Sequence, residues 1–201
     1  PASPPAQANP DLNLALRGYI STTAYLGLVD YSGGSDPYAP QLPGLFTDRR
    51  TATFRAAYQV YAWIWPPGCN CRGAPLTDWN VTLAGLLVTP METIRVPSNA
   101  TNIGNGYAVL VLYASTNRIT LKYTPDDNVV YGYTIHLENI CVEPRLLALY
   151  QSSNAAGRMQ LPALHSGQGI GTAMSNELGV AIRDTGSFMD PRSRKDWWQG
   201  R

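Results

Sequence analysis

Hydrophobic and polar residues alternate most regularly between residues 107 and 137, and this pattern predicts three consecutive β-strands. Residues 107–113 form a continuous apolar run, which is typical of a strand covered on both faces. Residues 118–124 alternate strictly between Arg, Thr or Lys and Ile, Leu or Tyr, and residues 129–137 also follow a period of two. Short connections built of turn residues separate the three segments, so we expect an antiparallel sheet here.

Further strands are expected on both sides of this centre, at 51–65, 78–89 and 92–96, and as a short hairpin of 177–183 and 187–189. One face of the 51–65 strand becomes aromatic along its length and ends in Tyr61, Trp63 and Trp65. These rings either form an exposed platform for a sugar or partner, or lie buried beneath the loop that follows.

One segment, residues 143–157, has the signals of an α-helix. Pro144 suits a first helical turn, Glu143 favours the positive end of the helix dipole, and Gly157 favours helix termination. Together these elements predict a mainly β protein, an antiparallel sheet sandwich or open barrel with one C-terminal helix.

The ends of the chain differ in composition from its centre and divide it into three parts. We expect an extended N-terminal arm at 1–17, a single β-rich domain at 18–190, and a basic, Trp-containing tail at 191–201. Trp197 and Trp198 in that tail either dock into a partner or cap the protein's own core.

Charge and composition narrow the functional classes. Only 14% of the residues are charged and the net charge is +1, which gives no electrostatic basis for nucleic-acid binding. No apolar run is long enough for a transmembrane helix. The Pro- and Ala-rich start resembles a mature exported chain, so we expect a secreted or cell-surface location.

Cysteines and glycosylation motifs extend this expectation. In an oxidising compartment we expect Cys69 or Cys71 to form a disulfide with Cys141, because cysteines two apart rarely bridge each other. The sequons at Asn80 and Asn99 are candidate glycosylation sites.

The C-terminal half resembles lysostaphin-like (LytM-type) zinc endopeptidase domains. The resemblance rests on Gly167-Gln-Gly-Ile-Gly171, on residues 178–191 up to an Asp-Pro pair, and on Gly132-Tyr-Thr-Ile-His-Leu137. It implies a zinc held by an early His and Asp and by a second His-x-His. Here no histidine precedes His136, and Glu177-Leu-Gly179 stands at the place of His-x-His. The resemblance therefore implies a peptidase-like scaffold without its metal ligands, and hence a pseudoenzyme.

Other catalytic patterns are absent from the sequence. It has no Gly-x-Ser-x-Gly elbow and no phosphate-binding Gly-rich loop with a lysine. His136 and His165 are the candidate active-site residues, each with the alternative of an ordinary structural histidine. We expect no cofactor and no metal.

These observations favour a secreted, non-catalytic structural or binding protein that associates with copies of itself into a homo-oligomer, filament or layer. Two alternatives stay open. One is a carbohydrate- or cell-wall-binding module that uses the aromatic residues, and the other is a hydrolase related to cell-wall endopeptidases.

Overall fold

The computed structural model describes residues 4–201, and the first three residues of the expected N-terminal arm lie outside this range. The strands are β1 (Tyr19–Ser21), β2 (Phe54–Ile64), β3 (Cys71–Pro75), β4 (Leu83–Leu87), β5 (Thr93–Arg95), β6 (Val109–Ala114), β7 (Arg118–Lys122), β8 (Tyr133–Glu138), β9 (Ile140–Val142), β10 (Ala163–Leu164), β11 (Gly169–Ala173), β12 (Glu177–Asp184) and β13 (Ser187–Met189). The helices are α1 (Leu14–Arg17), α2 (Pro144–Ala155) and α3 (Arg194–Trp197), with 3-10 turns η1 (Ala6–Ala8) and η2 (Leu42–Leu45).

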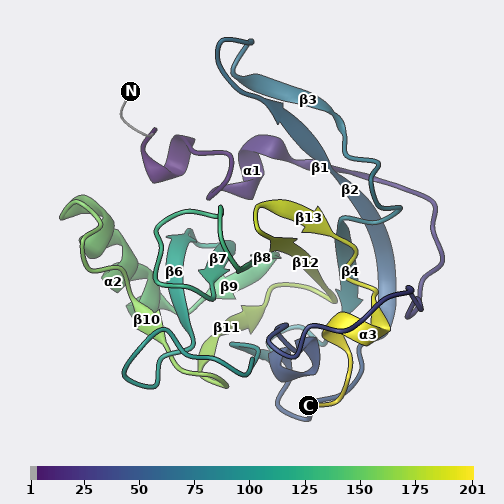
Figure 1. Cartoon of the computed structure of the whole chain (residues 1–201). Coiled ribbons are helices and arrows are strands. Elements are labelled where there is room, and N and C mark those ends of the chain that lie inside the picture. Colours follow the sequence, from purple (N-terminus) through teal and green to yellow (C-terminus); the bar gives the residue numbers. More distant parts are fainter. Residues whose placement is uncertain (1–3) are drawn as a thin grey trace.

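The fold is mainly β, as the sequence predicts (Figure 1). The large sheet has the order β1-β2-β4-β12-β8-β7-β6-β10, with β13 paired to β12 and β3 paired to β2. A second sheet has the order β5-β11-β9. The strand pairs are antiparallel. The large sheet does not close into a barrel.

The predicted central strands correspond to β6, β7 and β8, which pair with one another in sequence order. The third begins four residues later than expected, at Tyr133. Gly132, the residue before it, has a left-handed backbone with φ of 63°. Residues 129–132 therefore form a loop, and the strand begins only after it. All six residues of β8 are buried, because both faces of the sheet are covered at this point.

One face of the large sheet carries the main apolar core. Ile119, Leu121, Ile135, Leu137 and Val180 are each fully buried on it. The core continues into the second sheet and into the C-terminal segment, where its members include Ile140, Ile170, Trp197 and Trp198.

The opposite face of β7, β8 and β12 is polar, and the N-terminal arm lies over it. Thr120 donates from Oγ1 to the carbonyl of Leu12 at 2.7 Å, and Arg183 donates to Asp11 Oδ1 at 3.0 Å. Leu12 and Leu14 are buried. The arm is therefore a packed part of the domain over residues 6–17.

Helix α2 begins and ends close to the prediction. Glu143 caps it by accepting a hydrogen bond from the Leu146 amide at 2.7 Å, and Pro144 occupies the first turn.

Three expectations of detail differ from the structure. A β-bulge between Phe54 and Ala56 makes Phe54 and Ala57 both buried, although strict alternation places them on opposite faces. Strand β11 begins within the Gly-rich motif at residues 167–171, for which no strand is predicted, and α1 and α3 add two short helices to the one predicted.

Candidate functional site

The β2–β3 hairpin projects from the body of the protein (Figure 1). Among residues 4–201, β3 pairs with no strand other than β2. Arg72 anchors the base of the hairpin, where it donates to the Leu16 carbonyl at 3.2 Å and lies 5.0 Å above the ring centre of Tyr61. Beyond this anchor lies the hairpin tip, which we define as residues 64–71.

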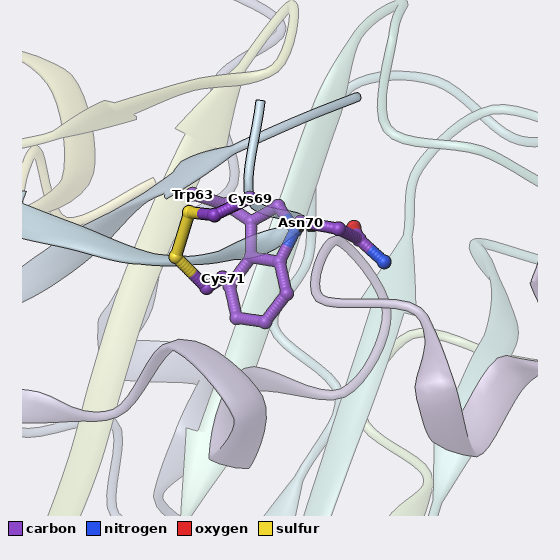
Figure 2. Close-up of a disulfide and its surroundings, with 4 residues drawn as sticks. All are labelled: Trp63, Cys69, Asn70 and Cys71. Atoms are coloured by element: carbon purple, nitrogen blue, oxygen red, sulfur yellow. Dashed lines mark hydrogen bonds between the residues drawn. A yellow bond between two sulfur atoms is a disulfide. The ribbon is translucent and has the colours of Figure 1, made fainter. Parts of the chain in front are cut away.

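A disulfide between Cys69 and Cys71 closes the end of the tip, and the indole N–H of Trp63 donates to Asn70 Oδ1 at 3.1 Å (Figure 2). The expected bridge to Cys141 is therefore wrong. Asn70 has a left-handed backbone, with φ of 49°, a conformation that Asn adopts more readily than most residues. This turn brings two cysteines together that the sequence argument judged too close to pair. Cys141 is free and exposed on β9.

The three aromatic candidates of the hairpin differ in exposure. Tyr61 and Trp63 are half-buried, whereas Trp65 is 41% exposed. The rings of Trp63 and Trp65 meet edge to face, with centroids 6.5 Å apart. The three rings therefore do not form a flat stacking platform, and Trp65 is the one that presents a free surface.

Trp65 also borders a groove of about 530 Å³ between the hairpin tip, the N-terminal arm and the end of α2. A bidentate ion pair lies on its far wall, where Arg158 donates from Nε and Nη2 to the two carboxylate oxygens of Asp127 at 2.8 and 2.6 Å. Arg158 is held in turn by Asn154 Oδ1 at 2.6 Å and the Leu112 carbonyl at 2.7 Å. The groove thus combines one exposed indole with fixed polar groups.

His136 and His165 lie in unrelated surroundings. His136 is buried on β8, with Nδ1 3.0 Å from Thr120 Oγ1 and its ring stacked on Phe188. Burial, with Arg183 and Arg17 nearby, lowers the pKa of His136 well below its usual value. His165 is exposed and stacks on Tyr107, with ring centroids 4.4 Å apart. Neither histidine faces a carboxylate with which it forms an ion pair in the described structure.

Trp197 and Trp198 are buried, and their indole N–H groups donate to the carbonyls of Asp190 and Pro191 at 2.8 and 2.9 Å. Of the two alternatives from the sequence, the structure has the tryptophans in the core.

The two candidate glycosylation sites differ in exposure. Asn80 is exposed, whereas Asn99 is half-buried and donates from its amide to Thr101 Oγ1 at 3.0 Å.

A cluster of buried polar groups beneath the N-terminal arm is not predicted by the sequence. Lys122, Thr134 and His136 each have a buried side-chain atom without a hydrogen-bond partner, and Arg183 lies on the same face of the sheet. The alternation of residues 118–124 indicated a polar face. A polar face usually contacts water, and no local signal marked the arm as its cover.

No group of three or more His, Cys, Asp or Glu residues within 4–201 is arranged to hold a metal ion. In the same range, no helix combines the length and apolar character needed to cross a membrane. Comparisons with protein-family models, with curated proteins and with solved structures find no match to this chain.

Proposed function

We propose that this protein is a non-catalytic structural protein of the cell exterior that associates with further copies of itself through the hairpin tip. The observation that carries the proposal is an ordered, uncharged projection. Residues 64–71 contain no charged residue, although a soluble domain usually carries charges on about a quarter or more of its surface. The low charge of the whole chain and the disulfide support an oxidising, extracellular setting.

The tip has the properties of a docking element. Ile64 and Trp65 are 45% and 41% exposed, so association can still bury apolar surface on both. Tryptophan is enriched among the residues that dominate binding energies at protein interfaces. The disulfide and the Trp63–Asn70 hydrogen bond order the tip before any partner arrives, which lowers the entropic cost of docking.

A second copy of the chain offers a receptor for this tip. A groove of about 380 Å³ near β10 is lined by the largely apolar side chains of Tyr107, Leu110, Met159 and Leu161. Met159 is 89% exposed. The groove is also lined by Asp127 and Arg158, which it shares with the groove that Trp65 borders, so the tip and its receptor are neighbouring but different surfaces of one molecule. Contact between two different surfaces of identical chains is heterologous, and it produces open filaments unless the rotation closes a ring.

The test is the assembly state of the purified chain, measured by analytical ultracentrifugation and electron microscopy. We expect concentration-dependent polymers that are lost in Trp65→Ser and in Met159→Lys. Leu149→Ser, on α2, is a matched control at a residue that is 55% exposed, and it should assemble normally.

Mixing the two defective variants sharpens the test. Each retains one intact surface, so the mixture should form heterodimers that grow no further. A wild-type chain that stays monomeric at about 100 μM, well above a micromolar Kd, would refute the proposal. Polymers that persist in Trp65→Ser would refute the assigned surface.

Carbohydrate binding is a second candidate, favoured by the groove that Trp65 shares with the Asp127–Arg158 pair. An indole face and planar polar side chains are the groups that a sugar ring can stack on and hydrogen-bond to. Retention on immobilised cell-wall glycan should fall in Trp65→Ala and not in Leu149→Ser. Equal retention of both variants would exclude this groove.

A further inference from the structure

A separate pocket of about 370 Å³ lies between α1, the connection from β3 to β4, and the β12–β13 hairpin. Figure 1 shows α1 next to β13, away from the hairpin tip. The guanidinium groups of Arg17 and Arg183 line the pocket, and these two residues are only 6% and 4% exposed. Leu76, Trp79 and Phe188 supply its apolar lining.

The charges around the two arginines do not balance. Arg17 Nη2 and Arg183 Nη2 both donate to Asp11 Oδ1, at 2.9 and 3.0 Å. Within residues 4–201, neither arginine forms a salt bridge with any other carboxylate. Two buried cations thus share one anion. Burial, opposed in part by Asp11, lowers the pKa of Arg183 to about 10, in keeping with incomplete compensation of its charge.

Hydrogen-bond donors also remain. Arg17 donates to the Pro10 and Tyr61 carbonyls and to Asp11. Arg183 donates to the Gly186 carbonyl and to the backbone and side chain of Asp11. A guanidinium has five N–H groups, so two N–H groups on each arginine have no protein acceptor in the described structure.

The rest of the pocket determines what kind of anion it accommodates. Phe188 lies beneath both guanidinium groups, and its ring centre is 5.5 Å from the Arg17 Cζ and 4.5 Å from the Arg183 Cζ. Trp79 is half-buried and packs edge-on against Tyr31, with ring centroids 4.9 Å apart. A bare inorganic ion would leave this apolar surface in contact with water. An anion with an apolar body would cover it.

We propose that this pocket binds a small organic oxyanion, whose carboxylate or phosphate lies against Arg17 and Arg183 and whose apolar body packs on Trp79 and Leu76. The planar fork of arginine matches both kinds of oxyanion through paired hydrogen bonds. This site is independent of the proposed self-association, since it shares no residue with the hairpin tip or the β10 groove.

The test uses four probes on the full chain: benzoate, phenyl phosphate, acetate and orthophosphate, at constant ionic strength set with chloride. NMR follows the indole N–H of Trp79 and the Nε–H of Arg183 during each titration. We expect saturable shifts at both groups. We also expect about tenfold tighter binding of the two aromatic probes than of acetate and orthophosphate, because burying an apolar ring contributes on the order of 1–2 kcal/mol. The tighter of the two aromatic probes identifies the source as a carboxylate or a phosphate.

Variants separate a built site from general salt effects. Asp78 also lines the pocket, is exposed and forms no salt bridge in the described range. Because its negative charge repels a bound anion, Asp78→Asn should tighten binding about threefold or more without affecting the core. Asp48→Asn, which changes the net charge equally at a distant exposed site, is the control and should not alter the affinity. Arg17→Lys keeps the charge but loses the fork, and should weaken binding about tenfold. Shifts that rise linearly for all four probes, or equal affinities in Asp78→Asn and Asp48→Asn, would overturn the proposal.

Discussion

Lys122 allows the cost of the buried polar face to be measured directly. The residue is fully buried on β7, and its Nζ has no hydrogen-bond partner. Burial lowers the pKa of Lys122 from 10.5 to about 8, with Asp126 and Asp184 opposing the shift and Arg183 adding to it. At neutral pH the folded protein therefore keeps a poorly compensated ammonium group away from water.

The size of the effect follows from the two pKa values. A difference between 10.5 and about 8 corresponds to roughly 3 kcal/mol, at about 1.4 kcal/mol for each pH unit. Because the pKa is lower in the folded state, the unfolded chain binds more protons between pH 8 and 10.5. Stability from this group thus rises with pH across that window. Below pH 8 both states are charged, and the full penalty remains.

Replacing Lys122 by Met removes the ammonium group and keeps a flexible side chain of similar length. We expect Lys122→Met to raise the free energy of unfolding by about 2 kcal/mol at pH 7, since part of the gain is lost to imperfect packing. The difference from wild type should shrink towards zero as the pH approaches 10.5. Urea unfolding followed by tryptophan fluorescence at several pH values measures both quantities.

The control is Lys195→Met, because Lys195 is the only other lysine of the chain and its side chain is 24% exposed. Its effect at pH 7 should stay below about 1 kcal/mol. The tyrosines are common to all three proteins, so their titration cancels in the differences. A Lys122→Met protein that is less stable than wild type at pH 7, or a gain that is constant with pH, would refute the reasoning.

Three further predictions concern other contacts. Asp11→Asn should lower the free energy of unfolding by about 2 kcal/mol, because Arg17 and Arg183 lose their shared carboxylate. Amide hydrogen exchange at residues 9–17 should become faster, and unchanged exchange would show that other contacts hold the arm. Glu143→Ala should cost about 1 kcal/mol in thermal or urea unfolding, because it removes the cap of α2, and Glu143→Asp should retain part of it. Tyr58 donates to Glu177 Oε1 at 2.6 Å, and burial together with this bond raises the pKa of Tyr58 to about 12, so the free energy of unfolding should fall as the pH rises from 10 towards 12. Tyr58→Phe should reduce that fall in urea unfolding. An identical fall above pH 10 in the variant and the wild type would contradict this assignment.

Local pattern predicted those elements whose signals lie within a few residues. The strict alternation of residues 118–124 gave β7, and Glu143 with Pro144 gave the start of α2. Elements defined by distant partners were missed. Strand β11 is rich in glycine and reads as a loop, yet it pairs with β5 on one side and β9 on the other. Strand pairing over such separations leaves no trace in local propensity.

The candidate site was predictable in its aromatic content and not in its geometry. The sequence marked Trp65 as a contact candidate, and the structure leaves it exposed at the end of a projecting hairpin. It could not separate Trp65 from Trp197, because tertiary packing decides that the first is exposed and the second buried. The Cys69–Cys71 bridge was rejected on the general rarity of such pairs, whereas the left-handed backbone at Asn70 is a property of this particular turn.

The N-terminal arm explains how the fold tolerates a polar face inside the domain. Burying the ammonium of Lys122 costs roughly 3 kcal/mol, and the arm also buries Leu12 and Leu14. Two leucine side chains contribute about 3 to 6 kcal/mol on burial, which is enough to offset that cost. Asp11 on the same arm supplies the single carboxylate for Arg17 and Arg183. Burial of the apolar residues of the arm therefore offsets the free-energy cost of the buried polar face. Asp11 alone neutralises only one of the two arginines, which leaves an excess of positive charge at the arginine pocket.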